Sequence, residues 1–423
     1  MMPHLNETSC AAGRQTAVLA PFDWGPGLAR TILTLDRPID AISLEPEKFR
    51  VREQKRSFDR RTRTDVVLTA ERKVTAARLC AADGRLLRGA SPYIALDLAC
   101  EAPYEGCPVY TDEGQHGVLD PQYRLKVSLE APLRDVDGYP VTALAVQESI
   151  DWQAARIPAL EGFDLTGRYD AGGGRQYRYA FYQPGDGRRH PLVIWLHGAG
   201  EGGSDLRMAL LGNRVTALRE PPFQRLMGGA CLLVPQCPDF WLTYTADGDW
   251  KGNPGRDSVH LEALLGLIRR CIDSCPEVDP RRVYLTGCSN GGFMTMDLLF
   301  RAPELFAAAA PCCEAFLDDG ITDEMLQRIR DIPLWLVWAE NDRIVPPERH
   351  ALPTWRRLSA LGAPELRRTV LKRVTDPTGL YCTPEGAPYE YNGHFSWVPF
   401  LDGVCRDAAG EDLWHWLAVQ RRR

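Results

Sequence analysis

The segment Gly-Cys-Ser-Asn-Gly at residues 287–291 constrains the fold more than any other part of the sequence. Residues 282–286 before it are typical of a strand, and residues 292–300 after it are typical of a helix. Glycines two residues either side of Ser289 let neighbouring backbone pass closely at a tight turn. The pattern therefore predicts a sharp strand-to-helix turn that exposes the Ser289 hydroxyl at a helix N-terminus, where negative charge is favoured. The alternative is an ordinary glycine-rich turn.

The pattern of apolar and polar residues in the 423-residue chain changes near residue 160. Residues 15–155 contain short β-rich runs between turn residues, and several alternate apolar and polar side chains. This pattern predicts an antiparallel, immunoglobulin-like β-sandwich over residues 1–160. From residue 161 to 423 strands alternate with helices, and the continuous apolar run 191–196 is typical of a strand buried on both faces. The second part is therefore predicted to be an α/β domain with a mostly parallel sheet.

Several further elements of the second part follow from the same periodicities. Strands are predicted at 230–235, 305–310, 333–338 and 368–374, and helices at 260–272, 348–361 and from 411 onward. Ligands of such sheets bind at the carboxyl ends of the strands. We therefore expect the functional residues in the loops that follow these strands.

A glycine-rich loop, His-Gly-Ala-Gly-Glu-Gly-Gly, follows the first apolar strand at residues 197–203. Its Gly-x-Gly-x-x-Gly spacing also fits a dinucleotide-binding loop, but the residues that follow do not form the expected second strand, and that function would leave Ser289 unexplained. We favour an oxyanion hole. Its donors are predicted to be the N–H groups of Ala199, or alternatively Gly200, and of Asn290.

Chain order in this type of site is Ser, then an acid, then His. His394 is the preferred base because it lies in a loop between the last predicted strand and the last predicted helix. Asp342 is the preferred acid because it follows the buried strand 333–338. The weaker candidates are Glu340, Asp376, Asp318 and Asp319 for the acid, and His350 and His415 for the base. The sequence thus predicts a Ser289–His394–Asp342 triad that acts through an acyl-enzyme.

Substrate contacts are harder to predict. Trp241, Tyr244, Trp250, Phe395 and Trp397 surround the candidate loops and are equally well explained by pocket lining or by loop packing. An aromatic wall would favour aryl or short acyl esters. Glu314 or Glu201 could instead hold a substrate amine, which would suit a peptidase.

Composition excludes several classes of function. The net charge is −6 without a basic region, which disfavours a nucleic-acid partner. Apolar runs are too short for a membrane span, and the first residues lack a secretory signal, so we expect a cytoplasmic protein. The thirteen cysteines include no Cys-x-x-Cys pair and are expected to be reduced thiols. We expect no metal and no cofactor.

The residues also carry a family resemblance. Residues 196–203, LHGAGEGG, and the PQCP segment at 235–238 resemble α/β-hydrolase serine esterases of the polyhydroxybutyrate-depolymerase and feruloyl-esterase type, some of which are labelled prolyl-oligopeptidase family. The DWGP segment at 23–26 resembles an N-terminal immunoglobulin-like domain found in some bacterial esterases. The family often has Arg at Gly202, Leu at Cys288 and Met at Asn290.

Three functions compete. A carboxylic ester hydrolase is favoured, a serine peptidase or amidase with the same triad is the alternative, and a non-catalytic binding module is third. The substrate would be a small ester or a short peptide. The N-terminal domain could also form a homo-oligomer contact.

Overall fold

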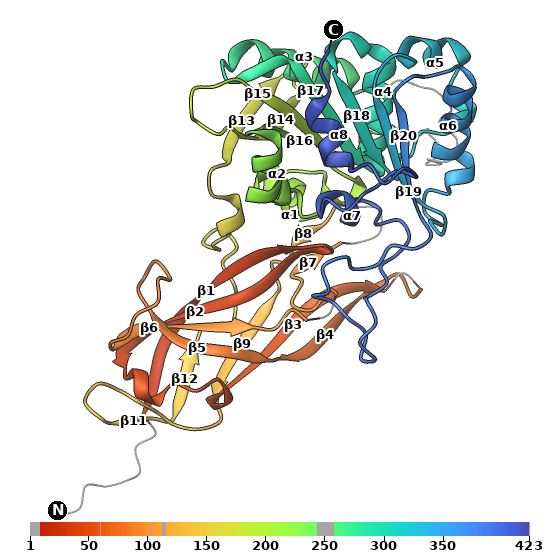
Figure 1. Ribbon diagram of the computed structural model, residues 1–423. Coiled ribbons are helices and arrows are strands. Elements are labelled where there is room, and N and C mark those ends of the chain that lie inside the picture. Colours follow the sequence, from red (N-terminus) through yellow and green to blue (C-terminus); the bar gives the residue numbers. More distant parts are fainter. Residues whose placement is uncertain (1–8, 60, 102, 112–115, 243–257, 423) are drawn as a thin grey trace, which may run out of the picture. The chain divides into compact units, whose positions relative to one another are not determined.

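The computed structural model describes residues 9–59, 61–101, 103–111, 116–242 and 258–422, and it divides the chain into two compact units. The first unit is Met1–Glu161 and the second is Gly162–Arg423. Figure 1 shows the first unit as strands and the second as strands with helices.

The first unit contains two main sheets. The five-stranded sheet has the order β12, β1, β2, β6, β5, with bounds β1 (Cys10–Phe22), β2 (Gly25–Ile39), β5 (Val74–Cys80), β6 (Ser91–Leu98) and β12 (Ala143–Val146). The three-stranded sheet has the order β4 (Thr64–Arg72), β3 (Phe49–Asp59), β9 (Arg124–Leu129). Two short ribbons complete the unit: β7 (Val109–Tyr110) with β8 (Val118–Leu119), and β10 (Leu133–Arg134) with β11 (Pro140–Val141).

Both sheets of the first unit contribute to one hydrophobic core. Leu33 and Leu96 from the larger sheet are buried in the same cluster as Val51 and Leu125 from the smaller one. This two-layer arrangement is what alternating strands predict, because every second side chain points inward. One pair differs from the antiparallel expectation: β1 and β12 run parallel. The immunoglobulin-like type of this unit stays a prediction.

The second unit is built on an eight-stranded sheet. Its order is β13 (Asp164–Asp170), β14 (Gln176–Tyr182), β16 (Cys231–Gln236), β15 (His190–Leu196), β17 (Val278–Cys288), β18 (Ala308–Cys312), β19 (Leu334–Ala339), β20 (Leu366–Leu371). β13 and β14 are antiparallel additions, and the other six strands are parallel. Leu196 pairs with Gly287 and Cys288 pairs with Cys312, so the carboxyl ends of β15, β17 and β18 lie at one edge.

Helices cover both faces of this sheet. On β15, Leu192, Ile194 and Leu196 join a core cluster with the helices α3 (Leu261–Ser274) and α4 (Asn290–Arg301). Trp195 points to the other face, where its ring lies 5.6 Å from that of Phe400 in α7 (Trp397–Leu401). The remaining helices are α1 (Leu206–Leu211), α2 (Pro221–Met227), α5 (Asp323–Ile329), α6 (Ala351–Ala360) and α8 (Leu413–Val419).

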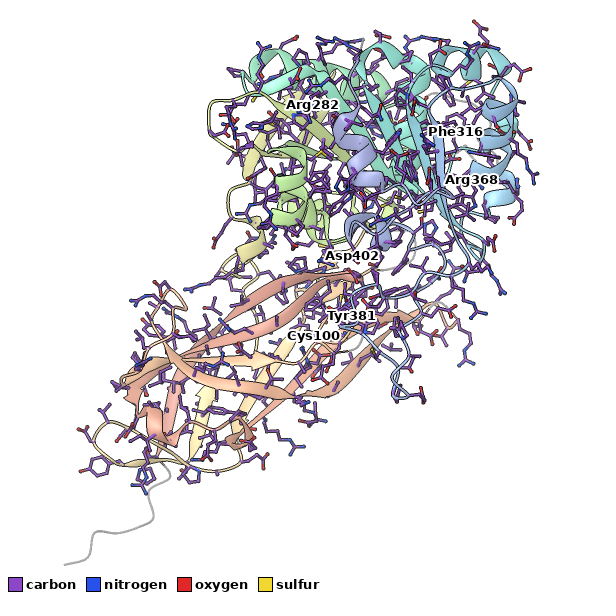
Figure 2. The ribbon with its side chains drawn as sticks, viewed as in Figure 1. Cys100, Arg282, Phe316, Arg368, Tyr381 and Asp402 are labelled. Carbon is purple, nitrogen blue, oxygen red and sulfur yellow. The ribbon has the colours of Figure 1, made fainter. Side chains whose placement is uncertain are left out.

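Two labelled side chains in Figure 2 show how helices are fixed to the sheet. Arg282 of β17 donates to the carbonyl oxygen of Ala418 in α8 at 3.1 Å. Phe316, in the loop after β18, stacks on Phe293 of α4 with ring centroids 5.0 Å apart. These contacts hold α8 and the loop after β18 against the elements around β17.

One predicted strand is shifted along the chain, and strands β13 and β14 and helices α1, α2, α5 and α7 were not predicted. The strand predicted at 305–310 is β18 at Ala308–Cys312, because Pro303 begins a 3₁₀ turn that ends at Leu305. None of the helices among the described residues is long and apolar enough to cross a membrane.

Candidate active site

Ser289 lies at the sharp turn between β17 and α4. Its backbone has φ 54° and ψ −115°, a conformation that residues other than glycine rarely adopt. The Ser289 N–H donates to the carbonyl oxygen of Cys312 at 3.0 Å, which fixes the turn against β18. The strand, the helix and the turn predicted from the sequence are therefore all present around this serine.

Two glycines of the turn are required by close backbone approach. A Cβ on Gly291 would lie 2.0 Å from the carbonyl oxygen of Leu196, and a Cβ on Gly287 would lie 2.7 Å from the same atom. Both distances are far below van der Waals contact, so the turn can sit against the end of β15 only with glycine at these positions.

The structure brings Ser289, His394 and Asp342 together. His394 Nε2 lies 2.9 Å from Ser289 Oγ, and His394 Nδ1 lies 2.8 Å from Asp342 Oδ2. Asp342 and His394 are 4% and 6% exposed, so little water competes for these hydrogen bonds. The geometry allows the imidazole to accept the Ser289 proton on Nε2 while Nδ1 donates to the carboxylate.

The loop after β19 orients Asp342. Its Oδ1 accepts the N–H groups of Ile344 and Val345 at 2.8 and 2.9 Å, which leaves Oδ2 for His394. The backbone N–H of His394 in turn donates to Asn392 Oδ1 at 2.9 Å. Local turn hydrogen bonds thus fix both partners of Ser289.

The alternative acids and bases make other contacts. Glu340 is exposed, and the His415 side chain is 72% exposed beside Asp412. His350 is buried, with Nδ1 2.8 Å from the carbonyl oxygen of Pro346. Asp376 accepts hydrogen bonds from Thr378 and Tyr381, and Asp318 accepts from Thr354 and Arg357, while Asp319 lies with Asp318 in a 3₁₀ turn.

The His-Gly loop is a short 3₁₀ turn, Ala199–Glu201, directly after β15. His197 Nδ1 lies 2.6 Å from the Gly198 carbonyl oxygen, and His197 Nε2 accepts the N–H of Cys237 at 2.9 Å. Gln236 supports the same loop from β16 by donating to the carbonyl oxygens of Glu201 and Asp205. Gln236 was not among the predicted site residues, although it belongs to the PQCP segment.

The predicted oxyanion donors start two neighbouring turns. Asn290 is the first residue of α4, where a backbone N–H has no acceptor within the helix. Ala199 opens the 3₁₀ turn after β15, followed by Gly200. The Asn290 side chain accepts the backbone N–H of Trp241 at 2.7 Å. A polar side chain at position 290 therefore fixes the loop that follows β16.

Cys313 is a further residue of the site that the sequence analysis did not single out. Its sulfur, a nitrogen of His394 and an oxygen of Asp342 all lie within 4.8 Å of one another. Burial alone lowers the pKa of His394, but Cys313 and the hydrogen bond to Asp342 outweigh burial and hold that pKa above its usual value. The only sequence signal was the pair of cysteines after a predicted strand.

The predicted substrate contacts have different surroundings. Trp241 is fully buried, with its ring 5.1 Å from that of His197, so it packs against the His-Gly loop. Trp397 is 6% exposed and lies edge-on to His394, with ring centroids 5.6 Å apart, next to Phe395. Tyr244 and Trp250 lie outside the described residues.

Two carboxyl groups near the site have pKa values above their usual range. Burial raises the pKa of Glu201 to about 7 and raises the pKa of Glu314 well above its usual value. Glu314 is 1% exposed, and its Oε2 accepts the Phe316 N–H at 2.8 Å. Glu201 fills the space between two glycines, since a Cβ on Gly198 or Gly212 would lie 2.9 or 2.3 Å from its side chain.

Comparison with known proteins gives two informative similarities, and no protein-family model matches the sequence. A crystal structure of a thermostable esterase aligns with a TM-score of 0.73 and 25% identity, over 96% of this chain and 99% of that one. A poly(3-hydroxybutyrate) depolymerase from Ralstonia pickettii is 35% identical over 80 residues. That stretch is 19% of this chain and only 16% of the depolymerase.

Proposed function

We propose that this chain, an α/β-hydrolase related to the esterases, cleaves small acyl or aryl carboxylic esters with Ser289 as its nucleophile. The hydrogen-bonded series from Ser289 Oγ through His394 to Asp342 carries the proposal. The thermostable esterase supports it, because the alignment includes nearly the whole of both chains.

In the proposed first half-reaction, Ser289 Oγ attacks the ester carbonyl carbon while its proton passes to His394 Nε2. The tetrahedral intermediate collapses when the imidazolium protonates the leaving alkoxide, which departs as an alcohol. Water then attacks the acyl-enzyme with His394 as the base, and the acid product leaves. Asp342 holds the imidazole in position and stabilises its charged form.

The oxyanion of each tetrahedral intermediate is proposed to accept hydrogen bonds from the N–H groups of Asn290 and of Ala199 or Gly200. Such donors are effective because they are oriented before the reaction begins. His197, Gln236 and Cys237 support the proposal because they restrain the loop that carries Ala199.

The preference for esters over peptides rests on the raised pKa values of the Glu314 and Glu201 carboxyl groups. A peptidase that anchors a substrate amine needs an ionised carboxylate. Glu314 is buried with a pKa well above its usual value, and burial of the Glu201 carboxyl group raises its pKa to about 7, so neither group is a fully ionised partner for a cation at neutral pH. An amidase with the same triad is the competing proposal.

Matched substrates test this choice. We expect hydrolysis of p-nitrophenyl acetate and butyrate by the wild-type chain, and a kcat at least ~10⁴-fold lower for Ser289→Ala. Aminoacyl p-nitroanilides should be poor substrates in the same assay. Faster cleavage of the anilides than of the esters, lost in Ser289→Ala, would establish the amidase instead.

A histidine pair provides the matched control. His394→Ala should reduce ester hydrolysis about as strongly as Ser289→Ala, because members of a triad act as a unit. His415→Ala should hydrolyse esters like the wild type, because His415 is exposed on α8. The reverse pattern would show that the base has been assigned wrongly.

A further inference from the structure

A group of potential metal ligands lies next to the His-Gly loop, in the segments after β16 and before α3. Cys237 follows β16, Asp239 is two residues further on, and His260 directly precedes α3. Cys237 Sγ lies 3.3 Å from Asp239 Oδ1, and His260 Nε2 lies 2.7 Å from the same oxygen. All three donor atoms are within 4.8 Å of one another.

The contacts of His260 suit a metal ligand. Its Nδ1 lies 2.7 Å from the hydroxyl of Tyr177, which holds the ring and directs Nε2 toward Cys237 and Asp239. His260 is 3% exposed, and its Nε2 makes no hydrogen bond of acceptable geometry with any described residue, although Asp239 is close. A buried ring nitrogen aimed between a thiol and a carboxylate is placed to bind a cation.

We propose that Cys237, Asp239 and His260 form a zinc-binding site, with water as the fourth ligand. A sulfur, a nitrogen and an oxygen donor form a set that Zn²⁺ accepts, and tetrahedral zinc requires ligand atoms about 3.3–3.6 Å apart. The sulfur–oxygen distance already fits. The shorter oxygen–nitrogen distance can open because the Asp239 side chain is 63% exposed, which also provides a path for the ion.

Charge and proton balance agree with this ligand set. Zn²⁺ replaces the proton of the Cys237 thiol, which is released to solvent, and binds the neutral imidazole and the Asp239 carboxylate. The dication, one thiolate and one carboxylate then sum to zero, which a largely buried position tolerates better than a net charge. The sequence offered no zinc signature, because His260 lies more than twenty residues beyond Cys237.

The site adjoins the proposed oxyanion hole. The Cys237 N–H donates to His197, and the Cys237 carbonyl oxygen accepts the N–H of Gly203, so its backbone holds both ends of the His-Gly loop. Trp241 donates to Asn290 and lies edge-on to His260, with centroids 6.0 Å apart. A bound ion would therefore stiffen the segment that positions both sets of predicted oxyanion donors.

The test is metal binding, measured independently of activity. Chelator-treated full-length chain is titrated with Zn²⁺ by calorimetry and with Co²⁺ by absorption, which reports cobalt–thiolate charge transfer. We expect one ion per chain, a thiolate band, and a higher thermal unfolding midpoint with Zn²⁺, because an ion that binds the folded chain stabilises it.

Variants locate the ion. Cys237→Ser should abolish the cobalt–thiolate band, and Asp239→Asn should weaken zinc binding ~10-fold or more. Asp239 is largely exposed, so its variant keeps the test valid if Cys237→Ser fails to fold. Two control variants alter other groups of potential ligands among the described residues: Cys313→Ala in the group with Asp342 and His394, and Asp186→Asn in the group with His190 and Glu277. Both should bind zinc as the wild type does.

Three results would overturn the proposal: no binding to the wild-type chain, binding unaffected by both site variants, or binding lost in Cys313→Ala. The last would place the ion on His394 and Asp342. Because binding is measured without substrate, failure of the zinc site leaves the proposed esterase function intact, and failure of that function leaves the zinc result interpretable.

Discussion

At the scale of single residues, the reactivity of Ser289 depends on the protonation of His394. The imidazole must be neutral to accept the serine proton, so ester hydrolysis should rise as the pH increases through the pKa of His394. Cys313 and Asp342 hold that pKa above its usual value. The acid limb of kcat/KM is therefore expected to have its midpoint above pH 6.5.

Cys313→Ala tests the contribution of the thiol. Removing a group that favours the charged imidazole should move the acid limb to lower pH than in the wild type. The measurement is kcat/KM for p-nitrophenyl acetate as a function of pH. Cys312→Ala, which removes the adjacent buried thiol, is the control and should leave the limb in place. An identical limb in all three proteins would refute the role given to Cys313.

Glu201 makes a separate contribution to stability. Burial raises its pKa from 4.5 to about 7, so the folded chain holds this proton more tightly than the unfolded chain. The protonated carboxyl group therefore contributes most to the free energy of unfolding at pH 4.5 and below, and this contribution is lost as the pH rises to 7. Glu201→Gln should become more stable relative to the wild type across that interval.

Thermal unfolding midpoints measured from pH 4.5 to 7 check this expectation. The difference between Glu201→Gln and the wild type should grow with pH. Glu340→Gln, at an exposed carboxyl group, should show a constant difference. A constant difference for Glu201→Gln as well would mean that its carboxyl titrates normally.

Some residues of the site could be predicted from the sequence, and others could not, for a physical reason. Ser289, Asp342 and His394 each follow or precede a recognisable strand or helix, so their shared edge could be predicted from chain order. Cys313, Gln236 and Tyr177 act through contacts with residues far away in the sequence, and local patterns such as the cysteine pair or the PQCP segment do not specify those partners. Trp241 was a candidate for the pocket because an aromatic side chain in a loop has the same local pattern whether it faces a ligand or the core.

At the scale of elements, the turn between β17 and α4 holds the site together. Gly291→Ala would place a methyl group 2.0 Å from the Leu196 carbonyl oxygen. Since neither backbone segment can move freely, we expect a loss of about 1–3 kcal/mol of stability together with reduced hydrolysis. Thermal unfolding and ester turnover measure the two effects.

Gly89→Ala is the matched control for this substitution. A Cβ at Gly89 meets nothing within 4 Å, and its backbone does not require glycine. The variant should therefore unfold and hydrolyse esters as the wild type does. If Gly291→Ala behaved in the same way, the close approach of the turn to β15 would not be a constraint on this fold.

Part of the order of elements in the second unit was predictable, because apolar runs and helical periodicity are local properties, but β13, β14, α1, α2, α5 and α7 were not predicted. Helix α3 and strands β15, β16 and β19 lie within a few residues of their predicted ranges. Strand β18 was displaced in the prediction, since its alanine-rich sequence has no marked periodicity. The parallel pairing of β1 with β12 joins segments more than a hundred residues apart, and no local pattern specifies such a partner.

At the scale of the whole molecule, the two units have separate hydrophobic cores. One core contains residues from both sheets of Met1–Glu161, and the other contains residues of Gly162–Arg423 alone. Independent cores predict two unfolding transitions. Leu33→Ala, which removes a fully buried side chain from the first core, should cost about 2–5 kcal/mol and lower one transition only.

Differential scanning calorimetry measures this directly. Gly291→Ala should lower the other transition, so the two variants together assign each transition to a unit. A single transition that moves in both variants would show that the units unfold as one cooperative body.

The central claim is that Ser289 is the nucleophile of an ester hydrolase, and a fluorophosphonate probe tests it most directly. Mass spectrometry of the labelled chain should find a single adduct on Ser289, formed in parallel with the loss of p-nitrophenyl acetate hydrolysis. No adduct should form on Ser289→Ala. An unlabelled Ser289 in a chain that still hydrolyses the ester, or unchanged hydrolysis by Ser289→Ala, would contradict the claim.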